Sequence, residues 1–370
     1  MAREARANRT PAKPSNIAGT MKLDTRCDSA EGLLTLLAFR GIGPQAAERI
    51  AARFSTLGDV RDASPRHLAE VVSDSVRSLL RDEHAWKSAR VHALRILDQA
   101  DEHSVRVLTA VDDEYPVWLR EIPDRPPVLY VKGKLPPNRR CVACIGTREP
   151  SRFGELATQR ITAHLVENGW SIVSGLAIGI DTLAHQAALD AKGHTVAVLA
   201  NGLETVYPKK NKALADRILE AGGAWLSEQP FGTAVLPRNL VRRDRLQSGM
   251  SAGTIVMQTD IEGGSMHTVR FTLLQKRRLF APVPDGQHSE EPKSRGILAL
   301  TRKSGAVLSD LLETQGEYRD LLQSLYRDKP PAVPLSSRED YRDLLGQLNE
   351  MLLSPAGDVQ SRTGPQIDLL

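Results

Sequence analysis

From Cys141 onward the sequence repeats one unit, a short apolar run followed by a segment whose apolar residues recur at helical spacing. In order, the apolar runs are CVACIG, SIVSG, HTVAVLANG, AWLSE, TIVMQT and RLFAPVP. Helices are expected over about residues 154–167, 181–191, 211–221 and 265–276. Continuously apolar strands that alternate with helices are typical of a parallel sheet covered on both faces. The unit therefore predicts a doubly wound α/β domain with a mostly parallel sheet.

The regions on either side of this series differ in pattern, and the 370 residues divide into four predicted parts. These are a basic tail expected to be disordered (1–25), a small all-α domain (26–110), the doubly wound domain (111–310) and a short helical segment with a polar tail (311–370). Prolines from Pro116 to Pro137 mark the start of the doubly wound domain, because proline interrupts helices. Ahead of a short helix near 339–353, the helical pattern is expected to break at Pro330, Pro331 and Pro334.

The all-α domain contains the tetrapeptide Gly41-Ile42-Gly43-Pro44 between its first two expected helices. Glycine adopts backbone conformations that other residues disfavour, and proline is favoured at the first position of a helix. The pattern resembles the turn of a helix-hairpin-helix, or SAM-like, domain, in which N–H groups at a helix start hold a nucleic-acid phosphate. A tight connection between two packed helices explains the same residues equally well, so both interpretations stay open.

Charge and hydropathy exclude several classes of protein. Lysine and arginine outnumber aspartate and glutamate by 49 to 45, which gives a net charge of +4, so a nucleic-acid partner would require positive charge that is concentrated locally. No apolar run is long enough for a membrane span, and the first 20 residues lack the apolar core of a secretory signal. We therefore expect a cytoplasmic protein without membrane contact.

The chain has three cysteines, Cys27, Cys141 and Cys144, and no disulfide framework is expected. Cys141 and Cys144 have C-x-x-C spacing, but they belong to an apolar strand without a second Cys/His pair nearby, so neither a redox centre nor a metal site is predicted. A nucleophile elbow, an H-E-x-x-H motif, a Walker motif and a dinucleotide fingerprint are also missing from the sequence. These absences favour a binding protein without a cofactor over an enzyme.

Ligands of doubly wound domains bind at the carboxyl ends of the strands, so the loops that follow the strands are candidate sites. The first such loop holds Gly146, Thr147, Arg148 and Ser151 ahead of a helix. Flexible backbone, hydroxyls and a cation at a helix start suit a phosphate. A later loop contains Tyr207, on which a base can stack or which simply covers the core.

The loop after the strand SIVSG contains Ser174, Gly175 and Gly179, followed by Asp181 and by His185 one helical turn later. Asp181 and His185 are candidates for an acid/base pair. The favoured alternative is that Asp181 caps the next helix while His185 is packed or hydrogen-bonded beneath the loop.

Two further segments have features of an anion site. Within eight residues, directly ahead of a core strand, the chain has four arginines: Arg238, Arg242, Arg243 and Arg245. This cluster is interpreted as a phosphate clamp, with a solvated charged turn as the alternative. After the strand TIVMQT, backbone N–H groups and hydroxyls are offered to an anion by Gly264, Ser265 and Thr268.

Taken together, these segments resemble the DNA-processing protein A family (DprA, also called Smf), over the region from the Gly41 turn to about residue 310. The family's motifs are matched in order by Tyr115-Pro116, Pro126-Pro127-Val128-Leu129-Tyr130, Gly133, Gly146-Thr147-Arg148, Ser174-Gly175-Leu176-Ala177, Gly179-Ile180-Asp181, His185, Tyr207-Pro208, Asn211, Ser227-Glu228, Gly232-Thr233, Gly264-Ser265, Thr268, Phe280-Ala281, Val283-Pro284, Ser294, Gly296 and Gly305-Ala306.

The resemblance implies an extended Rossmann-like fold, a homodimer, single-stranded DNA in a basic pocket, and loading of the RecA recombinase onto that DNA in transformation or recombination. It places DNA contacts at Gly146, Arg148, Arg243, Arg245 and the Gly264-Ser265 turn. With the residues singled out above, the predicted DNA-binding set is Gly146, Thr147, Arg148, Ser151, Ser174, Gly175, Gly179, Arg238, Arg242, Arg243, Arg245, Gly264, Ser265 and Thr268. No catalytic residue is predicted.

The chain is a divergent relative. Ile178 replaces the family's usual arginine, Asp244 replaces an asparagine between two arginines, and Gln258 ends a strand that usually ends in glutamate. A cation is lost and an anion gained in the implied pocket, with Arg238 and Arg242 as neighbouring cations. Two other functions stay open: a nucleotide-binding Rossmann-like enzyme or sensor that resembles nucleoside monophosphate phosphoribohydrolases, and a DNA-sensing component of a defence system.

Overall fold

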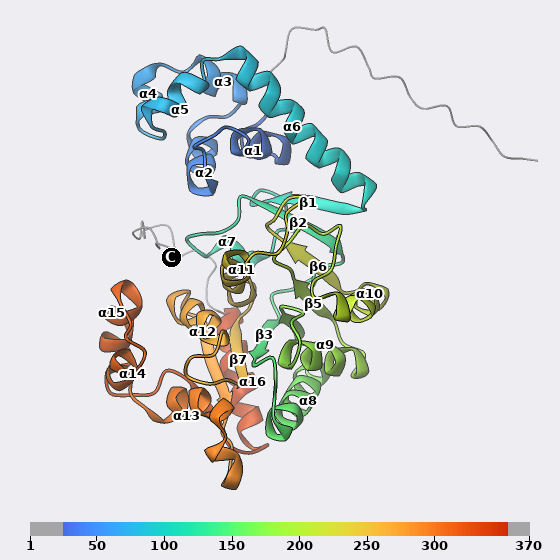
Figure 1. The fold of residues 1–370 in the computed structure, drawn as a ribbon, viewed down its shortest axis with the longest axis vertical. Helices are drawn as coiled ribbons and strands as arrows, with labels where there is room; N and C mark the ends of the chain where they lie inside the picture. Colours follow the sequence, from blue (N-terminus) through green and yellow to red (C-terminus); the bar gives the residue numbers. More distant parts are fainter. Residues whose placement is uncertain (1–24, 354–370) are drawn as a thin grey trace, which may run out of the picture.

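The computed structural model describes residues 25–353, and Figure 1 shows how their helices and strands are arranged. The predicted tail over 1–25, apart from its last residue, and the polar tail after 353 lie outside this range. Within it, nine strands form one sheet in the order β1-β2-β6-β5-β4-β3-β7-β8-β9. The strands are β1 (Val105–Thr109), β2 (Val128–Gly133), β3 (Cys141–Gly146), β4 (Ser171–Ser174), β5 (Thr195–Val198), β6 (Ala224–Ser227), β7 (Gly253–Gln258), β8 (Arg278–Pro282) and β9 (Val333–Leu335).

The direction of the strands confirms the predicted fold class. Strands β3 to β9 pair in parallel, whereas β1 with β2 and β2 with β6 are antiparallel. From β3 the chain progresses outward through β4, β5 and β6, then returns to the other side of β3 with β7. This reversal is the topological switch point at which doubly wound folds bind their ligands.

Helices cover both faces of the sheet, as a parallel sheet requires. On one face lie α8 (Arg152–Glu167), α9 (Ile180–Asp190), α10 (Lys212–Glu220) and α16 (Asp340–Leu353). On the other lie α7 (Val117–Arg120), α11 (Pro237–Gly249), α12 (Ser265–Leu274), α13 (Arg295–Arg302), α14 (Gly305–Leu311) and α15 (Gly316–Ser324). Three 3-10 turns complete this part, η1 (Lys209–Asn211), η2 (Gly286–Glu290) and η3 (Pro292–Ser294).

A helical module packs on the β1–β2 end of the sheet, at the top of Figure 1. It comprises α1 (Ala30–Leu37), α2 (Pro44–Arg53), α3 (Leu57–Asp62), α4 (Pro65–Ala69), α5 (Asp74–Leu79) and α6 (Glu83–Glu102). The glycine-proline turn joins α1 and α2 as predicted, with Gly43 as the N-cap of α2. One apolar cluster runs from this module into β2 and β6, and Arg125 pairs with Glu48 at 2.7 Å across the junction.

Three strands, β1, β2 and β9, lie outside the predicted apolar runs, and two of them form where helix or a break was expected. A helical pattern is predicted through residue 110, but Val105–Thr109 forms β1, because its short apolar run pairs with β2 at the edge of the sheet. After residue 330 the sequence predicts an interruption at the prolines followed by a helix, with no strand. Instead, Val333–Leu335 forms β9 beside β8. Pro334 is tolerated there because an edge strand does not need every backbone N–H group.

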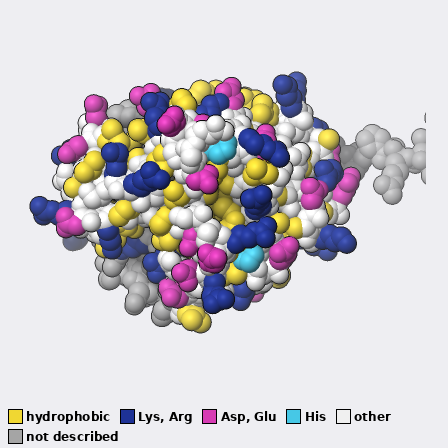
Figure 2. All heavy atoms as spheres, turned by 90° about the horizontal axis from the view of Figure 1, so that it is seen from below, with side chains coloured by type: hydrophobic (Ala, Val, Ile, Leu, Met, Phe, Trp, Pro, Cys, Tyr) yellow, Lys and Arg dark blue, Asp and Glu magenta, His cyan; other side chains and the backbone are white. Residues whose placement is uncertain are grey.

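The surface shows no separation of charge on the face drawn in Figure 2, where basic and acidic side chains alternate around apolar patches. The small net charge of +4 indicates that a concentration of positive charge requires side chains brought together locally. Among residues 25–353, no helix has the length and apolar character needed to cross a membrane.

The central strand β7 offers a test of the predicted core. Ile255 is fully buried between β3 and β8, so Ile255→Ala removes apolar contacts and leaves a cavity. We expect the free energy of unfolding, measured with urea, to fall by about 2–5 kcal/mol. Val307→Ala on α14, where the valine is 49% exposed, is the matched control and should change it by less than about 0.5 kcal/mol. Equal effects of the two substitutions would contradict the fold.

Candidate nucleic-acid interface

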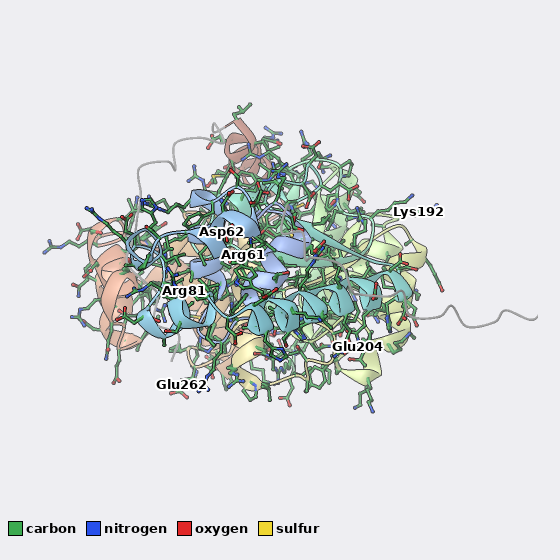
Figure 3. All side chains as sticks on the ribbon, turned by 90° about the horizontal axis from the view of Figure 1, so that it is seen from above. Arg61, Asp62, Arg81, Lys192, Glu204 and Glu262 are labelled. Atoms are coloured by element: carbon green, nitrogen blue, oxygen red, sulfur yellow. The ribbon has the colours of Figure 1, made fainter. Side chains whose placement is uncertain are left out.

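A groove of about 640 Å³ lies at the carboxyl ends of β3 and β7, at the switch point of the sheet. Figure 3 shows that Glu204 and Glu262, from the loops after β5 and β7, lie along the same side of the molecule, whereas Lys192, ahead of β5, lies toward the other. The groove brings together seven of the predicted residues: Gly146, Thr147, Arg148, Arg243, Gly264, Ser265 and Thr268.

The loop after β3 has a fixed backbone and an exposed cation. The Thr147 N–H group donates to the backbone oxygen of Gln258 at 2.8 Å, and the Ser151 N–H group donates to its side-chain oxygen at 2.9 Å. From the other side Gly179, with φ of +87°, packs so closely that an added Cβ would lie 2.4 Å from the Thr147 oxygen. The Arg148 side chain is exposed, and within residues 25–353 it makes no hydrogen bond or ion pair.

Arg243 is buried beside this loop and supplies a fixed positive charge to the groove. Its guanidinium donates to the backbone oxygens of Gly175, at 2.7 Å, and Val198, and its Nε atom donates to Asp244 at 3.1 Å. An added Cβ on Gly175 would lie 2.4 Å from the guanidinium, so a larger residue there would displace the Arg243 side chain. Arg243 therefore links the ends of β4 and β5 to α11.

The arginine cluster is not the loop that the sequence predicts. Pro237 is the first residue of α11. Because successive side chains project from different sides of a helix, the four arginines do not all face the same way. Arg245, 2% exposed, pairs with Asp124 at 3.1 Å and with Glu228, and Arg242 pairs with Glu228 at 3.0 Å. Arg238 is exposed and does not line the groove. Of the four arginines, the structure thus brings Arg243 alone to the groove.

Three other predicted residues support the groove from outside its lining. Ser151 is the N-cap of α8, and Gly179 is the N-cap of α9. Ser174 is fully buried and donates to the backbone oxygen of Cys144 at 2.7 Å. These residues hold the loops in place.

Asp181 and His185 do not form an acid/base pair. Asp181 lies in the first turn of α9, where Gly179 rather than Asp181 is the N-cap, and it accepts hydrogen bonds from the N–H groups of Gly175 and Ala177 at 3.1 and 3.2 Å. His185 is hydrogen-bonded to Thr195 at 2.7 Å, and burial lowers its pKa to about 3, so it is neutral. The favoured expectation for His185 is confirmed.

Asp244, the anion that the sequence placed in the implied pocket, lines the groove. Burial raises its pKa to about 6, although Arg243 next to it acts in the opposite direction.

Lys293 and His267 also line the groove and were missed. Lys293 lies on η3 and follows no strand directly, whereas His267 lies on α12 in the same segment after β7 as the predicted Ser265 and Thr268. Burial and the nearby Arg270 lower the pKa of His267 below its ordinary value.

A smaller pocket of about 60 Å³ adjoins the groove at Arg148 and Arg243. Its lining includes Ile178, 45% exposed, and Tyr207, 47% exposed. Tyr207 is therefore an accessible aromatic ring beside two cations, and not a cover for the core.

The cysteines carry no site. Cys141 and Cys144 point to opposite faces of β3, each in a different apolar cluster, and burial raises the pKa of each thiol to about 12. Among residues 25–353, no group of three or more His, Cys, Asp or Glu side chains is placed to hold a metal ion.

Comparison with known proteins agrees with the fold and the motifs. Residues 106–317 match the family described as DNA recombination-mediator protein A. Protein Smf of Synechocystis sp. is 32% identical over 274 residues, which cover 73% of this chain and 67% of the relative. Protein Smf of Escherichia coli is 39% identical over 214 residues, 57% of this chain and 55% of the relative. The X-ray structure of DNA processing protein A from Streptococcus pneumoniae superimposes with a TM-score of 0.55 and 27% identity, over 74% of this chain and 98% of that chain.

The raised pKa of Asp244 predicts a pH effect on stability. Because the folded-state pKa of about 6 exceeds the ordinary value of 3.8, the folded protein binds this proton more tightly. The resulting stabilisation is complete below about pH 4 and is lost as the pH rises through about 6. Asp244→Asn should therefore gain stability relative to the wild type over this interval.

Urea unfolding of the wild type and of Asp244→Asn at a series of pH values measures this difference. Asp310→Asn, with a side chain 76% exposed, is the control and should follow the wild-type curve. Parallel curves for all three proteins would show that the Asp244 pKa is not raised.

Proposed function

Because the chain belongs to the DNA-processing protein A family, we propose that it binds single-stranded DNA in the groove and passes that DNA to a RecA-type recombinase. In this proposal the protein protects incoming or exposed strands in the cytoplasm during transformation or recombination. It acts by binding, without chemical turnover and without a cofactor, and it works as a homodimer.

The observation that carries the proposal is the exposed Arg148 side chain on a rigid loop, facing a groove with the buried Arg243 and the Gly264-Ser265 turn. A guanidinium, backbone N–H groups and hydroxyls are the groups that proteins use to bind phosphate. These contacts are independent of base sequence, which suits a protein that must accept any strand.

The acids of the groove are engaged by protein partners, which reduces their repulsion of a phosphate. Asp181 accepts two backbone N–H groups, and Asp260 pairs with Arg295 at 2.9 Å. Asp244 accepts from Arg243 at 3.1 Å, but its charge depends on pH, because it gains a proton more readily than an ordinary carboxyl group and loses it near pH 6. We therefore expect binding to weaken as Asp244 ionises.

The smaller pocket favours a single strand over a duplex. Tyr207 and Ile178 present apolar surface within reach of the cations that would hold the backbone. An unpaired base can lie against such a surface, whereas the bases of a duplex are stacked inside the helix. The proposal thus assigns the phosphates to the groove and a base to the smaller pocket.

Fluorescence titration of a labelled oligothymidylate at increasing salt tests this proposal. The affinity should fall steeply with salt, and Arg148→Ala should reduce it by about fivefold or more while lowering the salt slope by about 1. Arg152→Ala is the matched control, since Arg152 is 69% exposed, pairs with Glu155 and does not line the groove. If both variants bind like the wild type, the groove is not the DNA site.

Recombinase loading and dimerisation are tested with the same proteins. The wild type should elute with twice the mass of one chain and should speed the assembly of RecA filaments on protein-coated single strands, whereas Arg148→Ala should accelerate it less. Incubation with nucleoside monophosphates is the control for the enzyme alternative and should release no free base. Unchanged filament assembly, or release of base, would contradict the proposal.

A further inference from the structure

Gln258, the last residue of β7, is fully buried at the point where the groove loop meets the sheet. Along β7, Val256 faces one apolar cluster and Met257 faces the other. The pairing register shifts here, so that Ile145 pairs with Val256 but Gly146 pairs with Gln258. This bulge sets the Gln258 amide beneath the loop that follows Gly146.

Gln258 holds both ends of the loop that contains Arg148. Its backbone oxygen accepts from Thr147 at 2.8 Å, and its side-chain oxygen accepts from the Ser151 N–H group at 2.9 Å. Its side-chain nitrogen also lies 2.8 Å from the Ser151 hydroxyl oxygen. One buried residue therefore fixes the backbone on either side of the exposed cation.

The same amide reaches a second segment, residues 286–296, which we call the strap. Its nitrogen lies 3.0 Å from a carboxylate oxygen of Glu291 and 3.2 Å from the Ser294 hydroxyl oxygen. Across the loop, Lys293 of the strap pairs with Glu149 at 2.6 Å. The strap is thus attached to the loop from inside through Gln258 and from outside through Lys293.

We propose that Gln258 is a positioning residue for the Arg148 loop, and that an amide is required there because it must accept from the loop and donate to the strap carboxylate at once. This proposal rests on the proposed function, since it assigns Gln258 a role in binding DNA through Arg148. Gln258 itself lies beneath the groove and does not line it.

The charge of Glu291 explains why a carboxylate would fail at position 258. Although burial alone would raise the pKa of Glu291, its hydrogen bonds with His288, Ser151 and Gln258 keep that pKa below the ordinary value, so Glu291 is ionised. In Gln258→Glu, two carboxylate oxygens would face each other across the 3.0 Å contact. The strap and the loop would then lose their inner attachment and keep only the pair between Lys293 and Glu149 on the outside.

The test uses the full chain, a labelled oligothymidylate and four proteins: the wild type, Gln258→Glu, Glu291→Gln and the double variant. Gln258→Glu should weaken binding about tenfold and lower the salt slope as loss of the Arg148 contact does. Glu291→Gln should bind like the wild type, because the new amide oxygen still accepts from Gln258. The double variant should recover affinity, because the donor and the acceptor have only exchanged places.

A combination with Arg148→Ala separates positioning from general stability. If Gln258 acts through Arg148, then Gln258→Glu should have little further effect in the Arg148→Ala background. Equal loss in both backgrounds, or no recovery in the double variant, would overturn the positioning role. If Gln258→Glu alone does not fold, the double variant decides: wild-type affinity supports the proposal, and weak binding by the folded protein overturns it.

The same titrations distinguish this proposal from the function on which it rests. A wild type that does not bind the oligonucleotide overturns both. A wild type that binds with a steep salt dependence, together with a Gln258→Glu variant of equal affinity and equal slope, overturns the positioning role alone.

Discussion

The buried guanidinium of Arg243 is the contact on which the groove depends. Burying a cation is costly unless it is paired and hydrogen-bonded. Here the cost is offset by two backbone oxygens, those of Gly175 and Val198, and by Asp244. Because these oxygens end β4 and β5, the same contact that stabilises the charge attaches α11 to the sheet. The position of α11 then sets one wall of the groove, and the close approach at Gly175 follows from it.

The sequence predicted the parts of the fold that repeat. Strands from β3 to β8 were identified because each is a continuous apolar run, and the loops after them, chosen as candidate sites, lie at one edge of the sheet. Strand β2 was missed because prolines crowd the segment around it, and the edge strands β1 and β9 were missed too. They are short, β1 follows a long helix directly, and β9 contains Pro334, so neither carries a strand pattern of its own. Their pairing is decided by the neighbouring strand.

The candidate site was only partly predictable, because the partners of each arginine are distant in sequence. When the cluster is treated as a loop, Arg243, which faces the groove, looks the same as Arg245, which pairs with Asp124 at a separation of 121 residues. A helical wheel of α11 would have separated the two, and its initial proline was the available signal. Gln258 was noticed only as a departure from the family's usual glutamate. Its contacts with Ser151 and Glu291 require the bulge in β7 and the fold of the strap.

Hydrogen exchange with and without a saturating oligothymidylate tests the central claim most directly, that DNA binds at the switch point of the sheet. The account predicts new protection of the backbone N–H groups in residues 146–151 and 263–265, which border the groove, and none in the Gly41 turn of the helical module. Protection confined to the helical module, with unchanged exchange around Arg148, would contradict it.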